Sequence, residues 1–379
     1  MTGMTARVDA AIQKALDENR IVGTVIMVDI DGKPAYRGIK GYFDREAGTP
    51  MREDAIFRLA SLSKPIVTAA AVAMIGKGVI GLDDPTTKYL PDFKPKLRDG
   101  STPTMTVRQL LTHTSGRGYG EPKPDDPYRA ARISGGGDQP GLTMEENFAR
   151  LMTVPLFFAP GTAWKYGMSI DVLGGVMGKA QGGTPGDAVQ AHLTGPLGMK
   201  DTGFSVSDPA RLGAVYADDV NGPVRMNEPT HELAAGVGKG MRFSPSRIFN
   251  PASYHSGGSG MVSSGPDFMK MLNALLAGDI LSAKYKDMAR TNQIGDMREK
   301  EFPGTGFGFL ASVITDPAKA KVPYSVGTFR WGGVYGHSWF VDPKMKMSAV
   351  LMTNTAVEGC NGSYPAEIRD AIYGRSLPA

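Results

Sequence analysis

The sequence has few residues of the kinds that form disulfides and metal sites. Cys360 is its only cysteine, so an intrachain disulfide and a metal site built from several thiolates are both excluded. The segment EGCNGS around it has no neighbouring histidine, which is typical of an inert thiol. The five histidines include no H-E-x-x-H motif. We therefore expect a protein without a metal ion or other cofactor.

Long apolar runs and blocks of like charge are also absent. No stretch reaches the roughly 18 to 20 apolar residues that cross a membrane, and residues 1–20 have scattered charges where an export signal has an apolar core. The 42 basic and 38 acidic residues are mixed along the chain, which argues against a nucleic-acid or membrane-surface partner. We expect a soluble, cytoplasmic protein that acts on a small molecule.

What the sequence does contain is typical of a folded enzyme-sized protein. Its 379 residues, 41% of them hydrophobic and 21% charged, are enough for one large domain or two ordinary ones. β-Branched runs over 22–30 and 34–41 flank Asp31-Gly32, a strong hairpin signal. Further strands are predicted over 307–315, 326–333, 337–343 and 346–354, and a closing helix over 365–373. The pattern predicts an antiparallel sheet flanked by helices.

The middle of the chain differs from both ends in composition and pattern. Residues 81–260 are punctuated by Pro and Gly and contain short amphipathic pieces such as TVRQLLTHTSG. We interpret them as a mostly helical domain inserted into a discontinuous sheet domain made of 1–80 and 261–379. The active site is expected at the interface of the two domains.

A polar group stands at the head of an apolar segment in FRLASLSKPIVTAAAVAM, residues 57–74. Pro65 is tolerated only in the first turn of a helix, so Ser61 lies at or beside the N-cap of a buried helix over 62–75. Residues three apart share a helical face, so Ser61 and Lys64 can meet, whereas Ser63 points roughly 100° away. Free N–H groups at the helix start favour negative charge near Ser61. Ser61 is the better nucleophile candidate, the alternative being an ordinary serine cap.

Two later segments add to this motif. PGTAWKYGMSIDVLG, residues 160–174, places Tyr166 in a turn before a helix that opens at Ser169. WGGVYG, residues 331–336, places glycines in a predicted strand, which indicates close approach of the backbone to a ligand.

In this order and spacing, the three segments resemble motifs of the penicillin-binding-protein and class C β-lactamase superfamily, and most closely its family VIII carboxylesterase branch. The resemblance covers nearly the whole chain, with LTHTSG at 111–116 as a further shared segment. It implies an α+β fold of the β-lactamase/DD-peptidase kind. It also implies that Ser61 and Lys64 are the catalytic serine and lysine, and that Tyr166 is the active-site tyrosine.

The resemblance implies an oxyanion hole as well, formed by the backbone N–H groups of Ser61 and Val334. The third motif falls on Trp331-Gly332-Gly333, where β-lactamases have Lys-Thr-Gly. Met168 stands where they have the Asn of Tyr-x-Asn. The missing lysine and threonine hold a β-lactam carboxylate in those enzymes, and Arg330 does not replace them because adjacent strand residues face opposite sides. An aromatic wall suits an uncharged acyl or alcohol group.

The serine proton has two candidate acceptors. A lysine titrates near 10.4, so Lys64 acts as a neutral base at pH 7 only if its pKa falls by about 3 units, at a cost of about 4 kcal/mol. Alternatively Lys64 stays charged and lowers the pKa of Tyr166, whose phenolate is then the base. The sequence leaves both open.

Other residues near the motifs are candidates for substrate binding: Trp331, Gly332, Gly333, Tyr119, Met168, Asp171 and His337. Core packing is the alternative for the aromatic residues, and capping of the helix after Ser169 is the alternative for Asp171. His113, where a helix is expected to end, is interpreted as a structural cap.

The leading functional interpretation is a serine carboxylesterase that hydrolyses short-chain esters through an acyl-enzyme on Ser61. An amidase, a transacylase or a weak β-lactamase on the same scaffold is the alternative within enzymes. A covalent sensor that is acylated but does not turn over is the alternative of another class.

Overall fold

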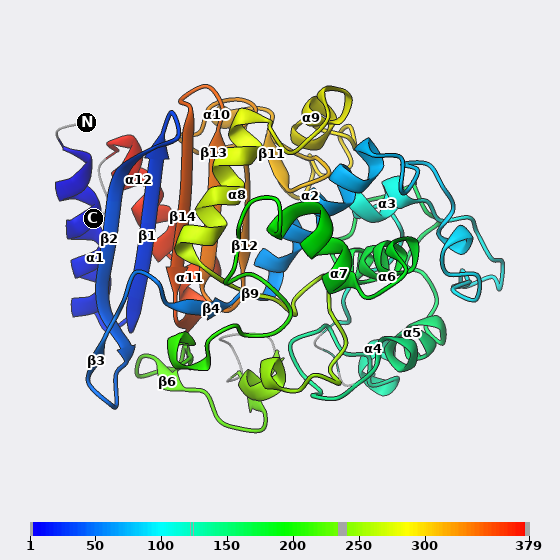
Figure 1. Cartoon of the computed structure of the whole chain (residues 1–379), viewed down its shortest axis with the longest axis horizontal. Coiled ribbons are helices and arrows are strands. Elements are labelled where there is room, and N and C mark those ends of the chain that lie inside the picture. The colour runs from blue at the N-terminus through cyan, green and yellow to red at the C-terminus, as the bar shows by residue number, and fades with distance from the viewer. Residues whose placement is uncertain (1–2, 122, 124, 234–240, 376–379) are drawn as a thin grey trace.

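A large antiparallel sheet forms the centre of the molecule (Figure 1). The computed structural model describes residues 3–121, 123, 125–233 and 241–375. The sheet has eight strands in the order β10-β11-β12-β13-β14-β1-β2-β3. They are β1 (Gly23–Ile30), β2 (Lys33–Asp44), β3 (Thr49–Pro50), β10 (Thr305–Phe307), β11 (Ser312–Ile314), β12 (Phe329–Gly333), β13 (His337–Asp342) and β14 (Met347–Thr353). The strands come from both ends of the chain, and the predicted antiparallel α+β fold is confirmed.

Turn chemistry decides where the strands begin and end. Asp31 and Gly32 have φ values of 53° and 71°, as a type I′ turn requires, and they join β1 to β2 as predicted. The prediction of one strand over 307–315 is wrong. Gly308 and Ala311 close a turn by a 2.9 Å backbone hydrogen bond, so the segment folds into the hairpin of β10 and β11. A side chain at Gly308 would meet the carbonyl of Ala289 at 2.6 Å, which explains the glycine.

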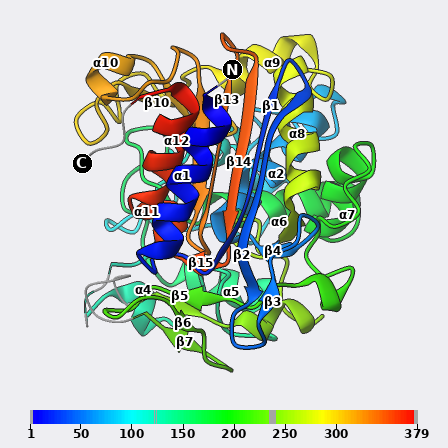
Figure 2. The ribbon, with the colours of Figure 1, turned by 90° about the vertical axis from the view of Figure 1, so that its left-hand side faces the viewer.

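Helices cover both faces of the sheet. α1 (Met4–Asp17) and α12 (Tyr364–Tyr373) lie side by side on one face (Figure 2). α2 (Ser63–Gly76) and α8 (Gly265–Ala277) pack on the other face (Figure 1). Every residue of α2 from Ser63 to Ile75 is buried, so the predicted buried helix is confirmed. The start of α2 is therefore held between the sheet and the rest of the core.

The segment between α2 and α8 contains five further α-helices and several two-residue strands among its described residues. Its helices are α3 (Val107–Leu111), α4 (Pro127–Ala130), α5 (Met144–Met152), α6 (Ser169–Gln181) and α7 (Pro185–Val189). Its short strands are β5 (Tyr216–Ala217), β6 (Val224–Arg225), β7 (His231–Glu232) and β8 (Arg242–Phe243). The division into a sheet domain and an inserted domain over 81–260 stays a prediction, and residues 122, 124 and 234–240 of that range lie outside the described residues.

Short elements complete the fold. They are β4 (Ile56–Arg58), which pairs with β9 (Val262–Ser264), then α9 (Ala283–Arg290), α10 (Pro317–Ala320), β15 (Thr355–Ala356) and α11 (Glu358–Asn361). The pairing of β4 with β9 fixes the chain immediately before Ser61.

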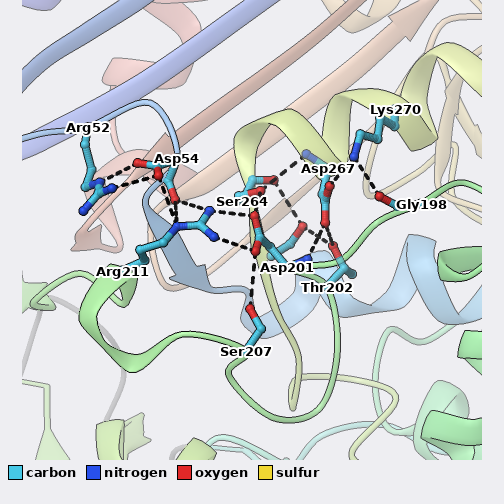
Figure 3. Close-up of polar contacts among 11 residues, drawn as sticks. Arg52, Asp54, Gly198, Asp201, Thr202, Ser207, Arg211, Ser264, Asp267 and Lys270 are labelled. Atoms are coloured by element: carbon cyan, nitrogen blue, oxygen red, sulfur yellow. Dashed lines mark hydrogen bonds and ion pairs between the residues drawn. The ribbon is translucent and has the colours of Figure 1, made fainter.

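An ionic network ties the loop after α7 to this region (Figure 3). Both Nη atoms of Arg211 donate to the carboxylate of Asp201, at 2.8 and 2.7 Å, and Arg211 also donates to the backbone carbonyl of Asp54. Ser264, at the N-cap of α8, donates to Asp201 at 3.0 Å. Burial opposes ionisation of Asp201, but the hydrogen bonds from Arg211 and Ser264 outweigh it and lower its pKa. The network links β4, α8 and the intervening loop.

Asp218, just after β5, makes the stability of the fold depend on pH. Burial and the negative charge of Glu358 raise the pKa of Asp218 to about 7, against about 3.9 in an unfolded chain. The folded state binds the extra proton between these values, so stability falls as pH rises from about 4 to 7. We expect Asp218→Asn to raise the free energy of unfolding by about 1 to 2 kcal/mol at pH 8, after allowance for partial exposure, and to have little effect at pH 4.5. Urea unfolding at the two pH values checks this, and an equal effect at both contradicts it.

Candidate active site

Ser61 lies in a tight turn that leads into α2. The turn is a 3₁₀ segment, Ala60–Leu62, and Leu62 is the N-cap of α2, so Ser61 lies beside the cap as predicted. Ala60 has a φ of 44°, in the left-handed region that is strained for a residue with a Cβ. The chain is held there because the N–H of Leu59 donates to the carbonyl of Met261 at 2.9 Å. This conformation leaves Ser61 at the wall of a cavity.

Ser63 has a different environment. It is fully buried, and its Oγ accepts a hydrogen bond from the N–H of Met261 at 3.1 Å. The prediction that Ser63 points away from Lys64 agrees with this placement. Ser63 secures the start of α2, and Ser61 is the serine that meets the cavity.

The ammonium of Lys64 has three hydrogen-bond partners. Its Nζ lies 3.2 Å from Ser61 Oγ, 3.0 Å from the Tyr119 hydroxyl and 2.8 Å from the carbonyl of Gly258. Burial by itself lowers the pKa of Lys64, but the oxygens of Tyr119 and Tyr166 outweigh it, so the pKa is raised. Lys64 is therefore a cation at neutral pH. Three acceptors for three N–H bonds hold the ammonium in place beside Ser61.

Two tyrosines flank this lysine. The Nζ of Lys64 lies 4.7 Å from the ring centroid of Tyr166 and 5.4 Å from that of Tyr119, and the two rings are 5.6 Å apart in an edge-to-face arrangement. A Cβ on Gly167 would lie 2.2 Å from the carbonyl carbon of Gly118, so two glycines let the two tyrosine-bearing segments touch. Burial raises the pKa of Tyr119 to about 12 against the opposing charge of Lys64. Tyr119 is therefore a neutral phenol at physiological pH.

Trp331 orients the second tyrosine. Its indole Nε1 donates to the hydroxyl oxygen of Tyr166 at 3.2 Å, and the two rings lie 4.9 Å apart. A donor to that oxygen stabilises a phenolate more than a phenol.

The proposed oxyanion donors lie where β12 meets the serine turn. Val334 directly follows β12 and, like Ser61, lines the cavity. Within the described ranges, neither the N–H of Ser61 nor that of Val334 donates to another backbone group. A Cβ on Gly333 would lie 2.3 Å from the carbonyl of Leu59, so this glycine lets β12 contact the serine turn. Both Ser61 and Val334 line the cavity, and no hydrogen bond from either backbone N–H is found among the described turns and loops.

We expect Gly333→Ala to separate β12 from the serine turn and to lower kcat for an ester about 10²- to 10³-fold, the usual cost of one oxyanion donor. The measurement is steady-state kinetics together with the melting temperature. Gly327→Ala, in a turn where an added Cβ contacts nothing within 4 Å, is the matched control for inserting a methyl group, although its φ of 85° adds local strain. Full activity in Gly333→Ala contradicts this role of the close contact.

The cavity has a volume of about 1530 Å³. Residues within 119–121, 126–138, 232–233 and 241–243 supply much of its wall. Seven of the predicted site residues line it, namely Ser61, Tyr119, Tyr166, Met168, Trp331, Gly332 and Val334. Gly333 lies behind the wall against the serine turn.

The structure does not bring Asp171 or His337 to the cavity. Asp171, in α6, is fully buried; it accepts a 2.5 Å hydrogen bond from Ser256, and burial raises its pKa. His337, in β13, is buried against Phe57, and burial lowers its pKa to about 4. Its Nε2 lies 2.7 Å from the carbonyl of Arg58, so a neutral ring donates there. Both residues support the walls from behind.

His113 follows the end of α3 in the left-handed region, with a φ of 56°, as its interpretation as a structural residue predicts. It is buried and contacts the ring of Tyr166, with the ring centroids 4.9 Å apart. Burial and the charge of Lys64 hold its pKa well below the usual value, so the ring is neutral. Its site role is to pack against Tyr166.

Sequence reasoning missed the contribution of Gly258. Its carbonyl accepts from Lys64, and a Cβ at this position would lie 2.4 Å from the carboxylate of Asp171. The available signal was the segment HSGGSGM over 255–261, whose glycines mark a close backbone approach. Tyr119 was predicted to bind substrate, and the structure also places it on Lys64.

The described residues lack two features that would point to another class of site. They contain no group of three or more His, Cys, Asp or Glu side chains placed to hold a metal ion. None of the helices among them combines the length and apolar character needed to cross a membrane.

A family model described as Beta-lactamase matches residues 8–371, so the chain belongs to the beta-lactamase family. The resemblance stated from the Ser61, Tyr166 and Trp331 segments is confirmed at this level. The chain is 45% identical to esterase EstB of Burkholderia gladioli, over 98% of this chain and 96% of that protein. It is 28% identical to lovastatin esterase of Penicillium rubens, over 90% and 91% of the two chains.

A solved structure shares the whole architecture. EstCE1, described as a hydrolase with promiscuous acyltransferase activity, superposes with a TM-score of 0.94 at 38% identity, over 98% of this chain and 99% of that one. The fold and the family together identify this protein as an enzyme.

Proposed function

We propose that the protein is a serine carboxylesterase that hydrolyses short-chain esters through an acyl-enzyme on Ser61. The observation that carries the proposal is the 3.2 Å contact between Ser61 Oγ and the buried Nζ of Lys64 at the wall of a large cavity. The likeness to two proteins named as esterases, one at 45% identity, supports an ester substrate.

In the proposed first step, Ser61 Oγ attacks the ester carbonyl while its proton passes to the oxygen of Tyr166. The positive charge of Lys64 and the N–H of Trp331 both stabilise the phenolate that accepts this proton. The N–H groups of Ser61 and Val334 stabilise the oxyanion. Collapse of the tetrahedral intermediate breaks the ester C–O bond, and Tyr166 returns its proton to the leaving alcohol oxygen.

In the second step a water molecule attacks the acyl-enzyme, Tyr166 accepts its proton, and Ser61 Oγ leaves with that proton. The carboxylic acid is released and the enzyme is restored. In this proposal Lys64 remains an ammonium throughout, and Tyr166 is the proton acceptor of the two that the sequence left open.

The choice of base predicts different effects for the two tyrosines. We expect Tyr166→Phe to lower kcat/KM about 10³-fold because the proton acceptor is lost. Tyr119→Phe, which removes a neutral hydroxyl that accepts from Lys64, is expected to cost about 10-fold or less. Steady-state kinetics of both variants on one aryl ester check this, and a larger loss in Tyr119→Phe contradicts the assignment.

The wall near Ser61 favours an uncharged reacting group. Trp331 and Gly332 occupy the positions at which β-lactamases have lysine and threonine, and Met168 lines the same cavity. A comparison of kcat/KM for a short aryl ester, a chromogenic cephalosporin and a peptide amide tests the proposal. We expect hydrolysis of the ester to dominate, and preference for either other substrate would replace the esterase with a β-lactamase or an amidase.

Acyl transfer to an alcohol is a second candidate activity. The observation that favours it is the likeness to EstCE1, whose description includes promiscuous acyltransferase activity. Product analysis after addition of a primary alcohol tests it, since a new ester should form at the expense of the free acid. A burst of one equivalent without turnover would instead support the covalent sensor.

A further inference from the structure

The cavity beside Ser61 continues around β12 to the opposite face of the sheet. Successive strand residues face opposite sides. Trp331 is paired with Trp339, which packs in the core with α2 and α8, whereas Arg330 is paired with Phe340, which packs with α1 and α12. β11 pairs with β12 only as far as Arg330, so the edge beyond it is not covered by β11. Both Trp331 and Arg330 line the cavity.

We call the part on the Arg330 side the annex. Its polar wall includes Arg298, Tyr324, Arg330, Ser338, Asn361 and Arg369, and Glu301, whose charge acts on Arg298, lines the same cavity. The whole cavity, at about 1530 Å³, is larger than the roughly 300 to 1,000 Å³ of most small-molecule sites. A short ester at Ser61 therefore leaves room in the annex for a second group.

The annex concentrates positive charge. Arg330 has no ion pair among the described residues, and its Nε is buried without a hydrogen-bond partner there. The guanidinium carbons of Arg330 and Arg369 lie 5.6 and 5.9 Å from the ring centroid of Tyr324, so the two cations share one aromatic ring. Arg369 is paired with Asp370 at 2.8 Å. Arg330 is left as the uncompensated charge.

A third guanidinium lies next to Arg330. Arg298 is buried, and its Nη1 donates to Ser312 Oγ at 2.8 Å, while Ser312 is the register partner of Arg330. The Nε of Arg298 also lacks a partner among the described residues. Burial and the charge of Arg330 lower the pKa of Arg298 to about 10, although Glu301 attracts it. Arg369 is paired with Asp370 and Arg298 is attracted by Glu301, so Arg330 is the annex cation that has no ion pair among the described residues.

An anion with planar oxygens matches this wall. A guanidinium binds a carboxylate through two parallel N–H bonds, and Ser338 and Asn361 add neutral donors. We propose that the annex binds an organic carboxylate, with Arg330 as its main partner and Arg369 as the second. The carboxylate either belongs to the ester substrate, at a position remote from the scissile bond, or to a separate small acid. The first source rests on the proposed esterase function, and the second does not.

A binding experiment tests the proposal without turnover. Full-length Ser61→Ala protein is titrated with glutarate by isothermal calorimetry at constant ionic strength, with the uncharged glutaramide as the matched ligand. We expect saturable binding of glutarate alone, weakened about 10- to 100-fold when Arg330→Met or Arg369→Met is added. Arg330→Lys should restore only part of the affinity because it lacks the paired N–H bonds. Arg98→Met, at an exposed arginine outside the cavity, is the control.

The proposal is overturned if glutarate and glutaramide bind equally. It is also overturned if neither Arg330→Met nor Arg369→Met changes the affinity for glutarate. Inorganic phosphate that binds tighter than glutarate and depends on Arg330 overturns the assignment to carboxylates. Kinetics then distinguish a carboxylate of the substrate from a separate small acid. The measured quantity is the ratio of kcat/KM for 4-nitrophenyl hydrogen glutarate, which carries a carboxylate, to kcat/KM for 4-nitrophenyl valerate, which does not. A ratio that falls at least 10-fold in Arg330→Met supports the substrate's own carboxylate, and an unchanged ratio beside Arg330-dependent glutarate binding supports a separate acid.

Discussion

Ser61→Ala is expected to lower kcat for a short aryl ester by about 10⁵-fold or more, the scale on which loss of a serine nucleophile acts. Ser61 Oγ is the atom that would form the acyl bond; among the described residues, the other hydroxyl within hydrogen-bonding distance of Lys64 belongs to Tyr119. The variant should fold normally, because Ser61 lies at the cavity wall and its Oγ has one partner in the described chain. The measurements are the rate of ester hydrolysis by the enzyme, corrected for spontaneous hydrolysis, and the melting temperature, which reports folding.

Ser63→Ala is the matched control, two residues further along the same turn. Its loss leaves the buried N–H of Met261 without an acceptor, so we expect about 1 to 3 kcal/mol less stability with activity kept within about 10-fold. If Ser61→Ala remains active, or if Ser63→Ala folds and is inactive, Ser61 is not the nucleophile.

Lys64→Met is expected to lower kcat/KM by about 10⁴-fold, at the upper end of what a group in proton transfer contributes. The Nζ of Lys64 contacts Ser61 and Tyr119 and lies 4.7 Å from the ring centroid of Tyr166, and methionine fills a similar volume without charge. Methionine removes the desolvation cost of the buried ammonium but leaves the Gly258 carbonyl without its donor, at a cost of about 1 to 3 kcal/mol. We therefore expect the free energy of unfolding to fall by at most about 3 kcal/mol while activity collapses.

Lys77→Met is the control for this variant, because Lys77 is the exposed residue at the other end of α2. It should keep its activity. Measurements of kcat/KM and urea unfolding on both variants separate catalysis from folding. A Lys64→Met protein that loses activity only in proportion to lost folded protein would make Lys64 a structural residue.

The predictions that held come from local rules with one strong physical cause. Pro65 fixes the start of α2, and the three-residue spacing then brings Ser61 to Lys64 and directs Ser63 elsewhere. Asp31-Gly32 allows the positive φ values of its turn and so fixes the first hairpin. The resemblance in motif order gave the family, and the family model over 8–371 confirms it.

The predictions that failed, and the features that went unpredicted, depend on contacts distant in sequence. The break at Gly308 in the expected strand arises from its packing against Ala289, which no local pattern reveals. α1 was not predicted, because residues 1–20 were compared only with the pattern of an export signal. The signal for a helix was present, since Val8, Ala11, Ile12 and Ala15 form a buried stripe at helical spacing.

The placement of site residues shows the same limit. The partner of Lys64 at Gly258 is 194 residues away and contributes only a carbonyl, which any residue has. His337 and Asp171 are near the motifs in sequence, but strand and helix geometry turn them behind the cavity wall. Sequence spacing predicts neighbours on one element, and the cavity is built from several.

The most direct test of the account is covalent labelling with a 4-nitrophenyl alkylphosphonate, followed by peptide mass spectrometry of the full-length protein. We predict one phosphonyl group per chain, attached to Ser61, with loss of esterase activity in proportion to labelling and no label in Ser61→Ala. A phosphonyl group attached to Ser63, Tyr119, Tyr166 or any other side chain, with Ser61 unmodified, would contradict it.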